Sequence, residues 1–500
     1  MENARLTNAR RNIYVPLMCQ IITIICGLIL PRVMLKAYGS EAYGAVSSIS
    51  QFLSYIAIIE GGIGGVARAA LYKPLANRSI AIIGGVVQEI ERFFRSIAII
   101  FLGYTFIIAC FFNQISHIEC FDWLESFSLV IIIAASTFAQ YFFGISYCIL
   151  LNAAQKVYLV YYINLLGTVL NTALTVFLVN TGFSLHIVKL ISAVVFVSKP
   201  LILSWYTKKQ FRLKEKKYPK TKLLTQKWTG LGQHLAYFFQ TNTDIVVLTF
   251  FSDLRVVAVY TVYNMVVSQI QGLISSFTSG MESVFGDMIA KNENLDEAFS
   301  HYNTLTSAVS TVLFGCTAVL IVPFVKIYTN GISDENYIRV VFGLLLVVSA
   351  YIYCLRIPYH NLIIAAGHFK QTKFAAYGEA TINIVLSVVL VQSLGMIGVA
   401  IGTVASTFFR MLYYAVYLKK NIINLSLSGV VKRQFVNGIS FVMIVITFSF
   451  LFDLSNVTDY VNWAINAIGV MFASILIVGL FNFLFYKKDV AFLMRKIIKN

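Results

Sequence analysis

Three charged residues lie deep inside long apolar stretches of this sequence: Asp244, Arg356 and Arg410. A charge at the centre of an apolar helix costs about 2.5 to 3.5 kcal/mol on membrane-insertion scales, so it normally faces a partner or a hydrated cavity. Glu379 lies in a segment of the same kind. The two arginines are suited to hold an anionic group, and a carboxylate at that depth can change its protonation. A buried structural ion pair is the alternative interpretation.

Polar residues in two apolar segments recur at helical spacing. Within residues 256–285 the polar side chains are Asn264, Ser268, Gln271, Ser275, Thr278 and Glu282. Residues 229–251 show the same spacing through Gln233, Tyr237, Gln240 and Asp244. Side chains at these intervals share one face of a helix. Packing between helices explains isolated polar residues, whereas stripes along several helices indicate a shared hydrated cavity.

The candidate residues form two groups. Those proposed to contact a substrate are Arg356, Arg410, Asp244, Gln240, Asn264, Gln271, Arg32 and Arg68. Those proposed for coupling or gating are Asp244, Glu379 and Glu282. The sequence has no HExxH, GxSxG, P-loop or CxxC motif, so we expect no catalytic residue, no bound metal and no resident cofactor. Coupling to Na⁺ or H⁺ is left open.

The segments that must position these residues are long and apolar. Hydrophobic residues make up 58% of the chain and charged residues 12%, against about 25% charged in a typical soluble domain. A helix of about 20 apolar residues crosses a bilayer. The pattern predicts an all-α, polytopic membrane protein with fourteen spans: 13–36, 43–68, 93–113, 121–150, 157–179, 185–206, 229–251, 256–285, 302–328, 338–366, 373–392, 396–418, 435–453 and 461–485.

The formal charge of +17 is unevenly distributed between the connecting segments. Basic residues gather in the segments on one side, with Lys36 and Arg255 as exceptions, and the opposite segments are short and neutral or acidic. The positive-inside rule then predicts that both termini are cytoplasmic. This distribution explains the basic composition without nucleic acid, which we do not expect as a partner.

The chain divides at a basic segment after the sixth predicted span. We predict an N-terminal lobe at 1–206, a basic cytoplasmic linker at 207–228, a C-terminal lobe at 229–418, and two further helices with a basic tail at 419–500. The spacing from Asn171 to Gly182 nearly equals that from Asn383 to Gly395. This similarity predicts a six-helix repeat in parallel orientation, as in transporters whose halves are related by an axis along the membrane normal.

Three motifs in order resemble a known family, the polysaccharide transporters. They are LKAYGSEAYG at Leu35–Gly44, QTNTDIVVL at Gln240–Leu248, and GHFKQTK at Gly367–Lys373 followed by Asn383. These transporters are the O-antigen and capsule flippases of the multidrug/oligosaccharidyl-lipid/polysaccharide (MOP) exporter superfamily, and the resemblance covers essentially the whole chain.

The resemblance implies two six-helix lobes around a partly cationic cavity, as in the multidrug exporter (MATE) fold. It implies a flippase that moves an undecaprenyl-pyrophosphate-linked glycan from the inner to the outer leaflet, with membrane lipids, a polysaccharide polymerase and chain-length machinery as partners. The last two helices resemble those of the fourteen-helix lipid II flippases, which form a groove for the lipid tail.

Two other functions are compatible with parts of the pattern. A cation-coupled drug or small-molecule exporter of the same fold would use Asp244, Glu282 and Glu379 as its acidic groups. The mixed charge contributed by Arg356 and Arg410 favours an anionic substrate instead. A membrane enzyme of glycan assembly would need a sizeable outer loop or an intramembrane catalytic histidine, and the predicted outer loops are short.

Overall fold

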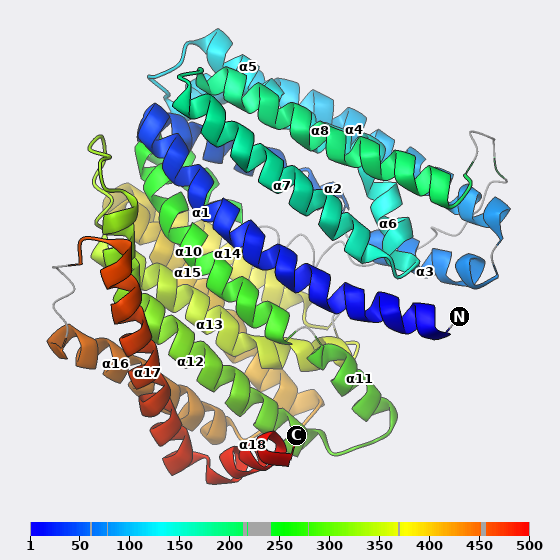
Figure 1. The fold of residues 1–500 in the computed structure, drawn as a ribbon. Coiled ribbons are helices and arrows are strands. Elements are labelled where there is room, and N and C mark those ends of the chain that lie inside the picture. The colour runs from blue at the N-terminus through cyan, green and yellow to red at the C-terminus, as the bar shows by residue number, and fades with distance from the viewer. Residues whose placement is uncertain are drawn as a thin grey trace. The chain divides into compact units, whose positions relative to one another are not determined.

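The computed structural model describes residues 2–60, 63–77, 79–213, 218, 242–278, 280–368, 371–451 and 457–499. Every regular element within these ranges is a helix (Figure 1). Twelve of the described helices are long and apolar enough to cross a membrane. The predicted all-α, polytopic membrane fold is therefore confirmed.

The chain forms two compact units. Unit 1 consists of residues 1–238 and 253–258, and unit 2 of residues 239–252 and 259–500. Most of the predicted basic linker, 207–228, lies outside the described residues, so the predicted lobe boundaries stay a prediction.

Unit 1 is a bundle built around three long helix contacts. Its elements are α1 (Glu2–Ser54), α2 (Ala57–Glu60), α3 (Ile63–Ala76), α4 (Ile80–Ser116), α5 (Trp123–Ala139), the π-helical turn η1 (Gln140–Gly144), α6 (Ile145–Ala153), α7 (Val157–Asn180) and α8 (Leu185–Gln210). Helix α1 packs along α7, and α5 packs against both α4 and α8 (Figure 1). The faces of α1, α5, α7 and α8 therefore meet inside this unit.

Helix α1 contains the first predicted span and the beginning of the second, because the break between them is local. Gly39 has φ 81° and ψ 173°, which an L side chain rarely adopts, and helical residues continue on both sides of it. Shortly after this break, Gly44 lies against the start of α10, where an added Cβ would stand 1.9 Å from the carbonyl oxygen of Leu254. The chain after Gly39 thus packs backbone to backbone with residues 253–258 of the same unit.

Unit 2 contains the remaining helices. They are the segment Asn242–Phe251, α10 (Leu254–Thr278) from residue 259 onwards, α11 (Met281–Ala290), α12 (Leu295–Tyr328), α13 (Val340–Ala365), α14 (Lys373–Leu394), α15 (Met396–Asn421), α16 (Leu427–Leu451), α17 (Tyr460–Phe485) and α18 (Lys487–Lys499). Gly395, at φ 56°, makes the turn between α14 and α15. Gly402 lies against Ser387, where an added Cβ would stand 2.6 Å from its hydroxyl, so these two helices pack very closely.

The last two long helices pack on α12. Ile444 of α16 fills the space above Gly315, and Trp463 of α17 donates a hydrogen bond to the carbonyl of Leu320 at 3.2 Å. In Figure 1, α17 crosses α16 and lies along α12, which agrees with the contacts between these helices. The other side of α17 exposes large apolar side chains, among them Ile468 and Phe472, as a lipid-facing helix does.

The fourteen predicted spans and the twelve described ones differ at two places. The second predicted span, 43–68, is divided between the end of α1 and the short helices α2 and α3. The seventh, 229–251, lies largely outside the described residues, and its described part is the short apolar helix Asn242–Phe251. The other twelve predicted spans each correspond to a described helix of sufficient length.

Candidate functional site

Three of the predicted site residues form one buried ion-pair triad in unit 2. Glu379 of α14 is fully buried, and Arg356 of α13 and Arg410 of α15 are each 5% exposed. The Nη1 atom of Arg356 contacts Oε1 of Glu379, and the Nη1 atom of Arg410 contacts Oε2. One carboxylate therefore ties three helices together. Two guanidinium groups against one carboxylate leave a formal charge of +1.

Aromatic rings surround the triad. The Nε of Arg410 donates to the hydroxyl of Tyr414 at 2.9 Å, and Arg356 lies 4.7 Å from the ring centroid of Tyr353. The imidazole of His360 stacks on Tyr414 with ring centroids 5.8 Å apart. Ring faces stabilise guanidinium groups through cation–π attraction. This geometry is a buried ion pair, which was the alternative interpretation of these charges in the sequence. Direct contact of either arginine with a substrate stays a prediction.

Asp244 lies in a second cluster of unit 2, at 5% exposure. Its Oδ2 accepts hydrogen bonds from the hydroxyls of Tyr260 and Thr403, each at 2.9 Å. Its Oδ1 accepts from Nδ2 of Asn383 at 3.4 Å. In the part of the chain that the structure describes, the carboxylate is thus held by hydroxyl and amide groups, and no basic side chain pairs with it.

The Asp244 cluster offers oxygen ligands to a small cation. Within the described residues, the Oδ1 atom of Asn383 is buried without a hydrogen-bond partner, and the hydroxyl of Thr403 also lies 3.0 Å from the carbonyl oxygen of Val399. Hard cations prefer such oxygen donors, and divalent ions usually require more carboxylates than one. Among the described residues, no group of three or more His, Cys, Asp or Glu side chains could hold a metal ion. A coupling or gating role for Asp244 stays a prediction.

The other predicted site residues lie apart from these two clusters. Asn264 and Gln271 are half-buried on α10, and Glu282 is exposed in the first turn of α11. Arg32 on α1 and Arg68 on α3 are half-buried in unit 1, whereas both clusters belong to unit 2. Gln240 lies outside the described residues.

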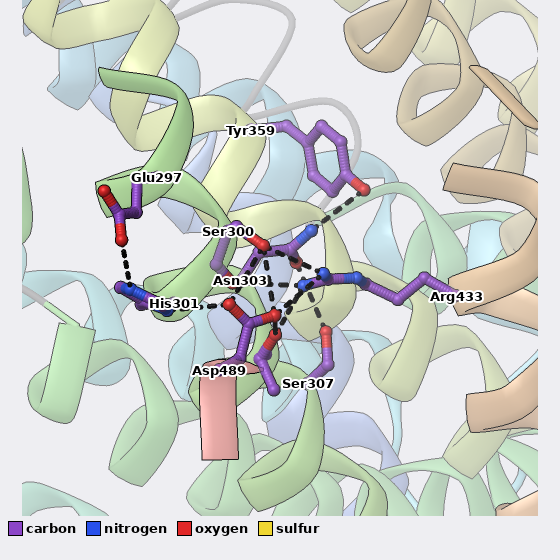
Figure 2. A network of polar contacts seen from close by, with 9 residues as sticks. Glu297, Ser300, His301, Asn303, Ser307, Tyr359, Arg433 and Asp489 are labelled. Atoms are coloured by element: carbon purple, nitrogen blue, oxygen red, sulfur yellow. Dashed lines mark hydrogen bonds and ion pairs between the residues drawn. The ribbon is translucent and has the colours of Figure 1, made fainter. Parts of the chain in front are cut away.

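Figure 2 shows a polar network that the sequence analysis missed. Asp489 of α18 accepts a hydrogen bond from Thr304 at 2.8 Å and lies 2.7 Å from Nδ1 of His301 and 3.5 Å from Arg433. Arg433 of α16 in turn donates to Thr304 at 2.8 Å. The network joins α18, α12 and α16. The sequence feature that could have indicated this network is Asp489, the single acidic residue of the otherwise basic segment Lys487–Lys499.

Comparisons with known proteins agree with this architecture. No protein-family model matches the sequence, and no curated protein matches it. A structure of the lipid II flippase MurJ in an inward closed conformation matches with a TM-score of 0.72 at 16% identity, covering 95% of this chain and 99% of that one. An inward-facing multidrug resistance MATE family transporter matches with a TM-score of 0.57 at 16% identity, covering 80% and 96%.

A further match is a MOP superfamily transporter from Pyrococcus furiosus, with a TM-score of 0.56 at 16% identity, covering 81% of this chain and 95% of that one. Together these structures show that the chain has the fold of MOP-superfamily transporters. Identities of this size show the fold alone.

Proposed function

We propose that this protein is a flippase that moves an undecaprenyl-pyrophosphate-linked oligosaccharide from the inner to the outer leaflet of the bacterial cytoplasmic membrane. The observation that carries the proposal is the share of this chain that matches the MurJ structure. The MurJ structure covers 95% of this chain, whereas the MATE transporter covers 80%. The part of the chain that the MATE match leaves uncovered therefore has counterparts in a lipid II flippase.

The charges of unit 2 support an anionic substrate. The triad of Arg356, Arg410 and Glu379 has a formal charge of +1 inside a low-dielectric bundle. A pyrophosphate approaching it is attracted more strongly than in water, because charges interact more strongly at low dielectric. The polar stripe of α10, with Asn264 and Gln271, provides amide groups for sugar hydroxyls.

The proposal is tested with purified protein in liposomes that contain a fluorescent undecaprenyl-pyrophosphate oligosaccharide. Flipping exposes the sugar of inner-leaflet molecules to an added impermeant enzyme or oxidant. We expect flipping with the native chain, a strong reduction with Arg410→Ala, and normal flipping with Lys419→Ala. Lys419 is a suitable control because it is an exposed basic residue on the same helix. Absence of flipping by well-folded native protein would contradict the proposal.

We further propose that Asp244 couples transport to a monovalent cation or a proton. The supporting observation is the set of oxygen atoms around Asp244, including the Oδ1 of Asn383, which has no hydrogen-bond partner among the described residues. The Asp244→Asn variant should lose stimulation by an imposed gradient, and imposing Na⁺ and pH gradients separately identifies the ion. Gradient stimulation that is unchanged in this variant would contradict the assignment.

A cation-coupled drug exporter is the second candidate function. The MATE likeness over 80% of the chain and the acidic Asp244 cluster favour it. Uptake of cationic dyes into the same liposomes distinguishes the two functions. Dye transport without movement of the lipid-linked sugar would favour the exporter.

A further inference from the structure

Unit 1 contains a polar cavity that the proposed transport site does not use. Its volume is about 360 Å³, and its lining comes from α1, α5, α7 and α8. The polar side chains that line it are Tyr43, Ser50, Ser136, Asn171, Thr175, Lys189 and Ser192. Ligand sites commonly measure about 300 to 1,000 Å³ and combine apolar walls with a few polar groups. This cavity is large enough for one sugar-sized molecule.

Lys189 is the charged residue of this lining. It is half-buried in the second turn of α8, and among the described residues it has neither an ion pair nor a hydrogen-bond partner. No carboxylate lines the described cavity. A buried ammonium group without a counter-charge is costly, and the cost falls when an anion pairs with it. The cavity therefore favours a negatively charged occupant.

Asn171 is a second, independent sign of a ligand. It is 5% exposed on α7, lines the same cavity, and its Oδ1 has no hydrogen-bond partner in the described structure. A buried unsatisfied acceptor costs about 1 to 3 kcal/mol. Thr175, one turn further along α7, also faces the cavity. A hydroxyl donor on the ligand would satisfy Asn171 while an anionic group pairs with Lys189.

We propose that this cavity binds an oxyanion carried by a sugar-sized, hydroxylated molecule, with the carboxylate or phosphate at Lys189 and a hydroxyl at Asn171. Where the ligand is part of the transported glycan, this inference rests on the proposed function and narrows the substrate to an acidic glycan. Lys189 lies near the end of α8 that the charge pattern places on the outer side. An acidic sugar would then occupy the cavity late in translocation.

The test measures binding by the full-length protein in nanodiscs of uncharged lipid, by calorimetry at constant ionic strength. The probes are glucuronate, glucose as its neutral counterpart, and inorganic phosphate. We expect glucuronate to bind and glucose to bind at least about tenfold more weakly, because a charge-assisted hydrogen bond is lost. The Lys189→Gln variant should lose about the same factor for glucuronate.

Lys199→Gln is the matched control. Lys199 lies on the same helix and is also half-buried, but it lies 4.3 Å from the ring of Phe196 and outside the cavity lining. The Lys199→Gln variant should leave glucuronate binding unchanged. Equal affinity for glucuronate in the native and Lys189→Gln proteins, or equal binding of glucose and glucuronate, overturns the proposal. Binding of phosphate with no binding of glucuronate overturns the acidic sugar and identifies a free oxyanion as the ligand.

A site-specific measurement locates the bound probe. The Ser192→Cys variant places a thiol in the cavity lining, and glucuronate should slow its alkylation as followed by peptide mass spectrometry. Unchanged alkylation with bound glucuronate would place the ligand elsewhere and overturn the proposal. These measurements need no transport, so a failure here is separate from a failure of the flippase assay.

Discussion

At the scale of residues, the buried triad illustrates how one carboxylate serves two arginines. Glu379 is fully buried and contacts a different guanidinium with each oxygen. Removing one partner of a buried ion pair costs about 3 to 5 kcal/mol, because it leaves an uncompensated buried charge. The triad thus combines a structural role in unit 2 with the charge that the proposed function requires.

We predict that Glu379→Gln destabilises the protein by roughly 3 to 5 kcal/mol, seen as a lower thermal unfolding midpoint. Asp287→Asn is the control, since it removes an exposed ion pair with Lys291 and should change stability little. Replacing Glu379, Arg356 and Arg410 together by Met should recover most of the stability, because no buried charge remains. A stable triple variant that still flips the lipid-linked sugar at the native rate would leave the arginines with a structural role alone.

Cys120 gives a prediction with a defined pH dependence. Desolvation of the thiol by the surrounding protein is the larger cause, and the nearby charge of Glu41 the second, of a pKa raised to about 12. The backbone N–H groups of Glu119 and Cys120 donate to Glu41 at 2.6 and 3.0 Å, so the carboxylate is fixed beside the thiol. A raised pKa keeps the thiol protonated, and thiolate is the form that reacts.

Alkylation of Cys120 should therefore be slow at neutral pH although the residue is exposed, and its rate should still be rising above pH 9. Glu41→Gln should accelerate the reaction at neutral pH. Peptide mass spectrometry after timed alkylation gives both rates. A rate that levels off near pH 9 in the native protein would show that the pKa is not raised.

At the scale of elements, the apolar pattern predicted helices well and side-chain partners poorly. Span length and hydrophobicity identify a membrane helix directly, because the bilayer thickness fixes both. The pairing of Glu379 with Arg356 and Arg410 depends on how three helices rotate and pack, which spacing within one helix does not reveal. Lys189 was missed because a lysine near a predicted span end normally reaches the interface.

The attachment of α18 is a property of elements that the sequence did not predict. Asp489 is buried and lies within bonding distance of Thr304, His301 and Arg433, on α12 and α16 (Figure 2). Hydrogen bonds to charged groups contribute about 1.5 to 3 kcal/mol each. Loss of the contacts that Asp489 makes should detach α18 without unfolding the rest of unit 2.

We predict that Asp489→Asn increases local opening of residues 487–499 by about tenfold or more, measured by hydrogen exchange. Glu297→Gln is the matched control. Glu297 lies 3.6 Å from the same His301 but is 72% exposed, so its loss should leave exchange in α18 unchanged. If Asp489→Asn and Glu297→Gln changed hydrogen exchange in α18 equally, the apolar contacts of α18 would be what attaches it.

At the scale of the whole molecule, the two sequence halves place an asparagine at corresponding positions with opposite charges nearby. Asn383 of unit 2 donates to the carboxylate of Asp244, while Asn171 of unit 1 lines a cavity with the ammonium of Lys189. Both asparagines are buried, and among the described residues neither Oδ1 atom has a hydrogen-bond partner. Unit 1 is therefore suited to an anion at Lys189, whereas unit 2 has both a carboxylate suited to a cation or proton and the triad with a formal charge of +1.

The division of the chain into two compact units predicts that each unit moves as a rigid body during transport. Spin labels at Phe183→Cys in unit 1 and Ser333→Cys in unit 2 report the distance between the units, since both residues are exposed. The native exposed Cys120 is replaced by Ser in all samples. We expect two distance populations by double electron–electron resonance, whose ratio shifts when the lipid-linked sugar is added.

A label pair within unit 2 provides the control for this measurement. Lys291 and Ser333 flank α12, a helix of 34 residues that spans about 50 Å at a rise of 1.5 Å per residue. Their distance should form a single population that the substrate does not change. Two populations within unit 2, or one unchanging population between the units in protein that flips the sugar, would exclude rigid-body rocking. Transport would then have to proceed by bending of single helices, for which the prolines inside α1, α12 and α13 would be the first positions to test.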